Sequence, residues 1–211
     1  MIERILPEWA ATAEEFGDVP EDTLFPEERP LVARATGMRR REFVTGRHCA
    51  RQALSRLGVP PGPIPRGERG APVWPPGTVG SITHCSGYRA AAVAEGRVAA
   101  AIGIDAEPHG PLPSGVLPTV ASPGEIAALG ALGPGACWDR ILFSAKEAVY
   151  KVWFPLTRRW LDFAQAVVEI DPDGGFTASL LVADPAMGTR TLGGRWLVSD
   201  GLVATAIALP R

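Results

Sequence analysis

The amino-acid sequence predicts an α+β protein built from two similar lobes. In each half, a helix with an apolar stripe is followed by a series of strand candidates. A hairpin pattern around Ser86-Gly87 also recurs around Asp200-Gly201, with the same alternation of small and apolar residues. We therefore expect lobes 1–103 and 104–211, related by pseudo-twofold symmetry, with a ligand cleft between them.

Composition restricts the possible functions. The chain has 211 residues, of which 46% are hydrophobic, as in a globular protein with a sizeable core. A formal net charge of −2 provides no overall basic field for nucleic acid. The three cysteines are an odd number without a Cys-x-x-Cys pair, which favours a reducing compartment. With neither a signal core nor a bilayer-length apolar run, a cytoplasmic protein is expected.

The N-terminal half is expected to begin with an irregular arm over residues 1–25. A short helix over 26–35 is plausible, and a longer one over 38–57 has a clear apolar stripe. Gly58 and then Pro60 supply the signals that end such a helix.

A connector and strands follow. Residues 59–77 contain seven prolines and four glycines, which predicts an extended connector. Three strands separated by turn dipeptides are then expected to form an antiparallel meander: 78–84, 88–94 and 98–105.

The C-terminal half has clear helix signals. Ser122-Pro123-Gly124-Glu125 combines an N-cap, a first-turn proline and a capping-box glutamate. A longer helix is expected over 138–153, and it should end before Pro155. Four further strands are expected at 166–171, 176–182, 194–199 and 202–209.

The segment 143–151 contains both lysines of the chain. Lys146 and Lys151 stand among 21 basic residues that are otherwise all arginine. An ammonium is a compact point charge, whereas a guanidinium is a planar fork, so two lysines in an arginine-biased chain suggest a specific need. Because Glu147 lies next to Lys146, the segment suggests phosphate chemistry.

Two more carboxylates precede this segment. Asp105 and Glu107 lie two residues apart at the end of a predicted strand and should therefore point to the same side. Together with Glu147 they form a set of oxygen ligands without thiol or imidazole, which suits a hard cation such as Mg²⁺.

These segments resemble the three ordered motifs of Sfp-type 4′-phosphopantetheinyl transferases, closest to the EntD-like (enterobactin-synthetase) branch. The motifs are Val79-Gly80-Ser81-Ile82-Thr83-His84-Cys85, Gly103-Ile104-Asp105-Ala106-Glu107 and Phe143-Ser144-Ala145-Lys146-Glu147-Ala148-Val149-Tyr150-Lys151. Including flanking similarity around Arg39 to Arg51 and Trp153 to Leu161, the resemblance covers most of residues 30–165.

The resemblance implies transfer of 4′-phosphopantetheine from coenzyme A to a serine of an apo acyl carrier or peptidyl carrier protein, releasing adenosine 3′,5′-bisphosphate. It also implies Mg²⁺ as the metal and a two-lobed monomer with its cleft between the lobes. Neither nucleic acid nor a membrane is an expected partner. The carrier can belong to fatty-acid, polyketide or peptide synthesis, siderophore assembly included.

Residue roles follow from the same resemblance. Asp105, Glu107 and Glu147 are expected to bind the metal, and Glu147 is also expected to be the base for the carrier serine. Lys146 and Asp105 complete the expected catalytic set. Coenzyme A contacts are expected from Arg39, Arg47, Arg69, Ser81, His84, Lys146 and Lys151.

Two alternatives are considered. A zinc protein would use His48-Cys49 and His84-Cys85, although adjacent side chains diverge and the spacing matches no zinc-finger pattern. A non-enzymatic binder of an acidic partner or nucleic acid would use a basic face of the first long helix. The residues of that face are Arg39, Arg40, Arg41, Arg47 and Arg51.

Overall fold

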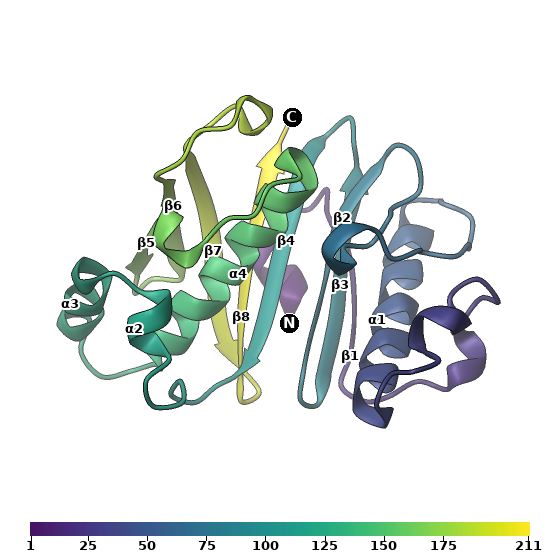
Figure 1. Ribbon diagram of the computed structural model, residues 1–211, viewed down its shortest axis with the longest axis horizontal. Helices are drawn as coiled ribbons and strands as arrows, with labels where there is room; N and C mark the ends of the chain where they lie inside the picture. Colours follow the sequence, from purple (N-terminus) through teal and green to yellow (C-terminus); the bar gives the residue numbers. More distant parts are fainter.

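The computed structural model describes residues 1–211 and shows two lobes side by side, each a β-sheet with a long helix against it (Figure 1). One lobe has a three-stranded sheet of order β1-β3-β2, and the other has a five-stranded sheet of order β4-β8-β7-β6-β5. The mixed α+β architecture of two lobes agrees with the fold class predicted from the sequence. None of the helices combines the length and apolar composition that a membrane crossing requires.

The N-terminal lobe packs one long helix against its sheet. Its elements are η1 (Ile2–Ile5), β1 (Ala11–Glu15), η2 (Glu21–Thr23), η3 (Arg29–Val32), α1 (Gly37–Arg56), η4 (Glu68–Gly70), β2 (Thr78–Cys85) and β3 (Tyr88–Glu95). Thr36 caps α1 by accepting a hydrogen bond from the Arg39 N–H. Small residues of α1, including Ala50 and Ala53, pack against Ala91 and Val93 of β3.

The C-terminal lobe is larger and packs α4 across its sheet (Figure 1). Its elements are β4 (Ala99–Pro108), α2 (Leu117–Val120), α3 (Pro123–Ala131), α4 (Trp138–Thr157), η5 (Phe163–Gln165), β5 (Ala166–Asp171), β6 (Gly175–Leu180), η6 (Pro185–Met187), β7 (Thr191–Ser199) and β8 (Leu202–Pro210). The expected capping box is present, since Ser122 and Glu125 each accept a hydrogen bond from the other's backbone N–H.

Close contact between α4 and β4 depends on Gly103. A Cβ atom at this position would lie 2.1 Å from the Ala148 carbonyl oxygen and 2.9 Å from a Val152 methyl group. Only glycine allows the helix to approach the strand so closely. The motif residues on α4 are thereby brought over those on β4.

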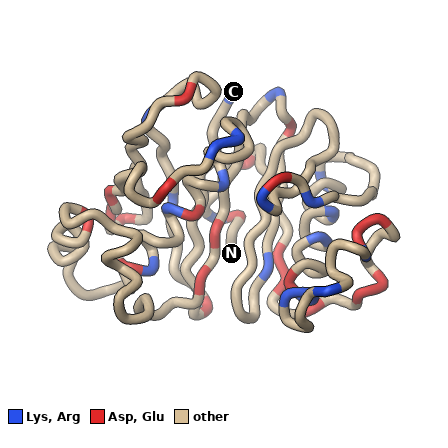
Figure 2. The backbone as a smooth tube through the Cα atoms, in the orientation of Figure 1, with Lys and Arg blue, Asp and Glu red and all other residues tan.

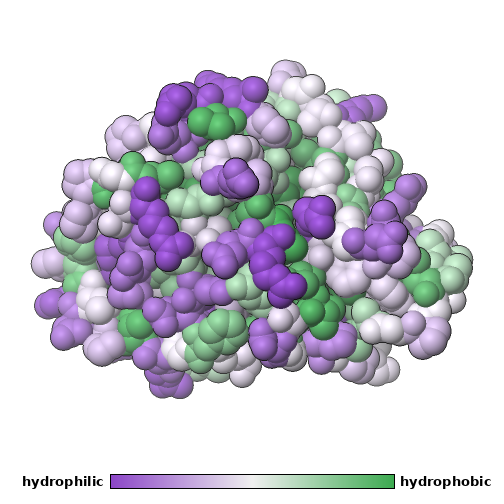
Figure 3. Space-filling model, turned by 180° about the vertical axis from the view of Figure 1, so that it is seen from behind, coloured by the Kyte–Doolittle hydropathy of each residue, from purple (hydrophilic) through white to green (hydrophobic).

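The two sheets meet along β2 and β4, which lie next to each other in Figure 1. Ser81 Oγ of β2 accepts the Ile104 N–H at 3.2 Å, and Thr83 Oγ1 accepts the Ala106 N–H at 2.9 Å. Side-chain hydroxyl groups therefore satisfy backbone donors of β4 at the junction of the lobes. On the reverse face, Figure 3 shows small groups of hydrophobic residues with hydrophilic residues between them.

Two predictions for the N-terminal half are wrong. The expected meander does not form, because β4 pairs antiparallel with β8 of the other sheet instead of with β3. The helix expected over 26–35 is limited to the short 3₁₀ turn η3. The arm over 1–25 also contains β1, which pairs with β3 and had no sequence periodicity to reveal it. The lobe boundary between residues 103 and 104 falls within β4 and stays a prediction.

The end of α4 also differs from the prediction. The helix continues through Pro155 to Thr157 and closes with Arg158 in the left-handed conformation, φ 58°, whose N–H donates to the Phe154 carbonyl. Pro155 lies in the last turn, so the hydrogen bond that it removes and the distortion that its ring causes affect only the end of the helix. The recurring hairpins are confirmed, because two-residue turns join Cys85 to Tyr88 and Ser199 to Leu202, with Gly87 and Gly201 at φ 77° and 74°. The two turns differ in conformation, since Asp200 also has a positive φ of 53°.

Candidate active site

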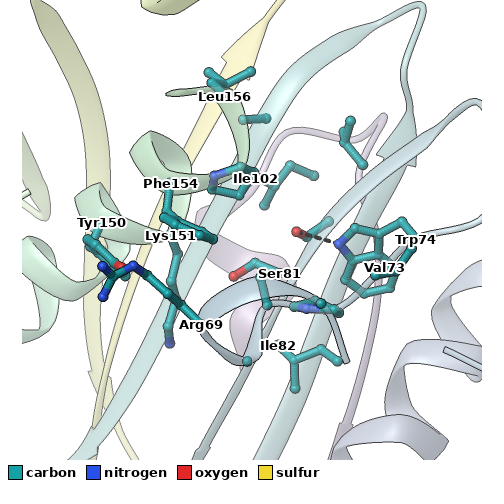
Figure 4. Close-up of a pocket in the computed structure, with 18 of the residues that line it drawn as sticks. Arg69, Val73, Trp74, Ser81, Ile82, Ile102, Tyr150, Lys151, Phe154 and Leu156 are labelled. Carbon is teal, nitrogen blue, oxygen red and sulfur yellow. Dashed lines mark hydrogen bonds between the residues drawn. The ribbon is translucent and has the colours of Figure 1, made fainter. Parts of the chain in front are cut away.

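A cleft of about 710 Å³ lies between the lobes (Figure 4). Its walls are β2 and the preceding loop 67–74 on one side, and β4 with the C-terminal half of α4 on the other. The Trp74 indole N–H donates to the Gly80 carbonyl at 2.9 Å and holds the loop against β2. The cleft is lined by charged groups and apolar side chains together, as ligand sites commonly are.

Arg69 reaches across the mouth of this cleft toward Tyr150 on α4 (Figure 4). Its guanidinium carbon lies 5.3 Å from the centre of the Trp160 ring, and the Trp160 and Tyr150 rings are 5.2 Å apart. Arg69 has a positive φ of 51°, and Gly67 and Gly70 flank it. The loop therefore places a cation from one lobe over the aromatic residues of the other.

Asp105 is the most extensively bonded carboxylate at the site. Its Oδ1 lies 2.8 Å from Lys151 Nζ and 3.4 Å from Thr83 Oγ1, and its Oδ2 accepts the Ser144 hydroxyl at 2.8 Å. The residue is only 6% exposed. Because its donors come from β2 and α4, Asp105 lies where both lobes meet.

Glu107 and Glu147 complete the predicted acidic set. Glu147 lines the cleft, and burial together with the negative charge of Asp105 raises its pKa. Burial and Asp105 likewise raise the pKa of Glu107, which also lies 3.0 Å from Arg140. The three carboxylates thus influence one another electrostatically, although no group of three or more such side chains has metal-ligand geometry in this arrangement. An oxygen-only set under mutual repulsion fits a hard divalent cation.

The structure separates the two lysines. Lys151 lines the cleft, whereas Lys146 is buried with its side chain 1% exposed. Lys146 Nζ lies 2.9 Å from Glu125 and donates to the Phe163 carbonyl at 3.0 Å. The predicted phosphate contact through Lys146 is therefore corrected, because its ammonium is already paired inside the C-terminal lobe. Residues 146 and 151 differ by five positions, or about 140° around a helix, so they face different directions.

A smaller pocket of about 150 Å³ gathers basic groups next to the cleft. Arg39, Arg47, Arg66 and His84 line it, and Arg39 borders both cavities. Arg39 Nη1 donates to His84 Nε2 at 2.6 Å, while His84 Nδ1 lies 3.5 Å from Glu42. Burial, reinforced by the Arg39 charge, lowers the pKa of His84, so the neutral imidazole presents its Nδ1–H toward Glu42.

Two predicted contact residues are more buried than expected. Arg47 is 5% exposed, donates through Nε to the Ile64 carbonyl at 2.8 Å and stacks over Phe43. Burial lowers its pKa to about 10, with neighbouring arginines contributing. Ser81 lines the cleft but uses its oxygen to accept the Ile104 N–H. Both residues form part of the pocket walls.

The structure adds two residues that the sequence did not single out for the site. Arg66 lines the smaller pocket, and its guanidinium packs close to Gly70, where a Cβ atom would lie 3.0 Å from Nη2 of Arg66. Arg140 pairs with Glu107 and donates to the carbonyls of Gly110 and Pro111. The signal for Arg66 was its position in the same glycine-rich loop as Arg69. No local pattern marked Arg140, because its partners are about 30 residues away.

Three of the five arginines on the basic face of α1 pair with acidic residues of the segment 18–28, and Figure 2 shows blue and red segments side by side there. The pairs are Arg40 with Glu21 at 3.3 Å, Arg41 with Asp18 at 2.9 Å and Arg51 with Glu28 at 2.9 Å. A free basic surface for an acidic partner or nucleic acid is therefore not formed by these residues. The alternative binding-module interpretation loses its main support.

The zinc alternative also conflicts with the structure. Cys49 and Cys85 are buried, and burial raises the pKa of both thiols to about 12. Zinc binds the thiolate, which is scarce at neutral pH when the pKa is so high. Cys49 instead donates to the Arg89 carbonyl at 3.7 Å.

Basic groups and carboxylates around one cleft between two lobes are the kind of groups that bind phosphates and a hard cation. Comparison with known families is specific. Residues 27–94 match the 4′-phosphopantetheinyl transferase N-terminal domain, and residues 101–204 match the 4′-phosphopantetheinyl transferase superfamily.

Individual relatives agree. The chain is 56% identical to the 4′-phosphopantetheinyl transferase Svp of Streptomyces mobaraensis, covering 99% of this chain and 89% of the relative. It is 50% identical to the 4′-phosphopantetheinyl transferase PptT of Mycobacterium tuberculosis, over 94% and 92% of the two chains. Enterobactin synthase component D of Salmonella typhimurium is 32% identical over 83% of this chain and 74% of the relative. This chain therefore belongs to the 4′-phosphopantetheinyl transferase superfamily and is a transferase enzyme.

Proposed function

We propose that this enzyme transfers 4′-phosphopantetheine from coenzyme A to a serine of an apo acyl carrier or peptidyl carrier protein, with Mg²⁺ and with release of adenosine 3′,5′-bisphosphate. The observation that carries the proposal is that the smaller basic pocket adjoins the cleft, since Arg39, Gly70, Pro72 and Ile82 line both. A nucleotide with several phosphates and a long neutral arm needs a site of this mixed character.

Phosphate groups would be held by residues of both lobes. We assign the nucleotide phosphates to the smaller pocket, with Arg39, Arg66 and His84 as contacts and Arg47 as part of its wall. Lys151 and Arg69 border the cleft and would face the pyrophosphate. Lys151 replaces Lys146 in this role, because only the Lys151 ammonium is accessible from the cleft.

The carboxylates would hold Mg²⁺ through Asp105, Glu107 and Glu147. When bound, the cation supplies Lewis-acid stabilisation of the charge that develops on the pyrophosphate. Repulsion among the three carboxylates contributes to the raised pKa of Glu107 and Glu147, and a bound cation would relieve that repulsion. This electrostatic gain supports the assignment.

The transfer step joins the carrier serine oxygen to the β-phosphorus as the bond from that phosphorus to the bridging oxygen breaks. Glu147 accepts the serine proton, and its raised pKa brings a carboxylate base closer to neutral pH. Arg69 and Lys151 stabilise the departing phosphate, and the bisphosphate leaves with the bridging oxygen. The cleft is built from one chain, which supports a monomeric enzyme.

An intact-mass assay tests the proposal. The protein is incubated with coenzyme A, Mg²⁺ and several apo carrier proteins, with a chelator control. A carrier heavier by one phosphopantetheine, seen only with metal present, is the expected result. Glu147→Gln should remain folded and lose about 10²-fold or more in rate, since a positioned base contributes at least that much. Absence of any mass shift with the wild-type enzyme would refute the proposed reaction.

A further inference from the structure

Two buried hydroxyl groups contact Asp105, and a third contacts one of these two. Ser144 Oγ lies 2.8 Å from Asp105 Oδ2, and Thr205 Oγ1 lies 2.9 Å from Ser144 Oγ and 2.9 Å from the Ser144 carbonyl oxygen. Thr83 Oγ1 approaches the other carboxylate oxygen at 3.4 Å. Ser144 and Thr205 are completely buried. Thr205 of β8 is also the register partner of Asp105 on β4.

The directions of these hydrogen bonds follow from the donor inventory. An ionised carboxylate only accepts, so the single Ser144 proton is donated to Asp105. Ser144 therefore has no proton left for Thr205, and the Thr205 hydroxyl is the donor. Its two acceptors, the hydroxyl oxygen and the carbonyl oxygen of Ser144, are each 2.9 Å away. Thr205 thus donates to Ser144, and Ser144 donates to Asp105.

Thr205 lies on the face of β8 that packs against α4, where Ile207 of the same strand belongs to the hydrophobic core with Ala145, Ala148 and Val149. A valine would match the shape of Thr205 on a β-strand. Burying a hydroxyl group in the protein interior is unfavourable in free energy unless the group is hydrogen-bonded. The Thr205 hydroxyl contacts the two oxygens of Ser144, so the presence of a hydroxyl here is explained by its effect on that residue.

We infer that Thr205 is a positioning residue for phosphopantetheinyl transfer. It holds the Ser144 hydroxyl in the rotamer that donates to Oδ2 of Asp105, while Oδ1 remains directed toward Lys151 and the cleft. This inference rests on the proposed function, in which Asp105 is a metal ligand. Hydrogen-bond partners that orient a ligand typically change metal affinity by about 10- to 100-fold when removed.

The test uses Mn²⁺ as a paramagnetic probe, titrated into the full-length enzyme and followed by electron paramagnetic resonance. Thr205→Val removes the hydroxyl and keeps the shape, whereas Thr205→Ser keeps the hydroxyl. Thr45→Val is the matched control, because Thr45 is also completely buried and its oxygen accepts the Val19 N–H on the distant side of α1. The Mg²⁺ dependence of transfer is measured in parallel.

We expect Thr205→Val to weaken Mn²⁺ binding about tenfold and to raise the Mg²⁺ concentration for half-maximal rate by a similar factor. Thr205→Ser should restore both, and Thr45→Val should change neither. Ser144→Ala should weaken binding at least as much, and adding Thr205→Val to it should have no further effect, because Thr205 acts through Ser144. The Ser144→Ala comparison also serves if Thr205→Val fails to fold.

Wild-type Mn²⁺ affinity in folded Thr205→Val, or an equal loss in Thr45→Val, would overturn the inference. So would an additive loss in the double variant. A wild-type enzyme that neither binds Mn²⁺ nor modifies a carrier would instead refute the proposed function itself, so the two failures are distinguishable.

Discussion

Replacing each lysine of α4 by methionine gives the sharpest test of how the site is built. Lys146 and Lys151 lie in one motif, yet their side chains are 1% and 26% exposed. Lys146→Met removes the partner of buried Glu125, and Lys151→Met removes a cation from the cleft. Methionine keeps the length and the helix propensity of lysine, so the main change is the ammonium.

The stability costs should differ clearly. Breaking a buried ion pair typically costs about 3–5 kcal/mol, because the remaining charge is left uncompensated. Glu125 still accepts the Ser122 and Val168 N–H groups, so the lower limit, about 3 kcal/mol, is expected. For a chain of this length that corresponds to a Tm lower by about 6–12 °C. Lys151→Met should cost about 1 kcal/mol, since its ammonium is partly solvated.

The catalytic effects should have the opposite order. Loss of one preorganised cation near the transferred group costs about 10²–10³ in kcat, so Lys151→Met should be nearly inactive while remaining folded. Lys146→Met, assayed below its Tm, should keep most of its activity. Scanning calorimetry and the intact-mass assay on both variants provide the comparison. Normal thermal stability of Lys146→Met together with lost coenzyme A affinity would refute the reasoning and restore the phosphate role predicted from the sequence.

Three further outcomes are expected. Gly103→Ala should lower the free energy of unfolding by about 3 kcal/mol, because the added methyl group would collide with a carbonyl of α4. The measurement is the urea midpoint, which should fall, and an unchanged midpoint would contradict that contact. Cys49 and Cys85 should resist iodoacetamide at pH 8, because both are buried and this pH is far below their raised pKa of about 12. Mass spectrometry should therefore count one adduct on the native protein, at half-buried Cys137, and three on the unfolded protein. Rapid labelling of all three cysteines in the native protein would contradict this burial. Arg66→Ala should raise KM for coenzyme A about tenfold with little change in kcat, as measured by steady-state kinetics. An unchanged KM would show that Arg66 does not contact the nucleotide.

Local sequence signals predicted the regular elements well. The long helices, the hairpin turns at Gly87 and Gly201 and the four C-terminal strands agree with the structure because their periodicity and capping residues act within a few positions. The partner of β4 could not be predicted this way. Its ladder with β8 joins residues about 100 positions apart, such as Asp105 and Thr205, and alternation within a strand does not specify its neighbour.

The sequence by itself determined the family, the two-lobed α+β class and the motif residues from which the candidate site is built. Tertiary structure decided which of those residues are available to a substrate. Lys146 is buried against Glu125 and Lys151 borders the cleft, because helix rotation and the packing of α3 and β5 set their environments. Pairing of three α1 arginines with the acidic segment 18–28 was likewise decided by the fold, since an ion pair depends on distance in space and not on separation along the chain.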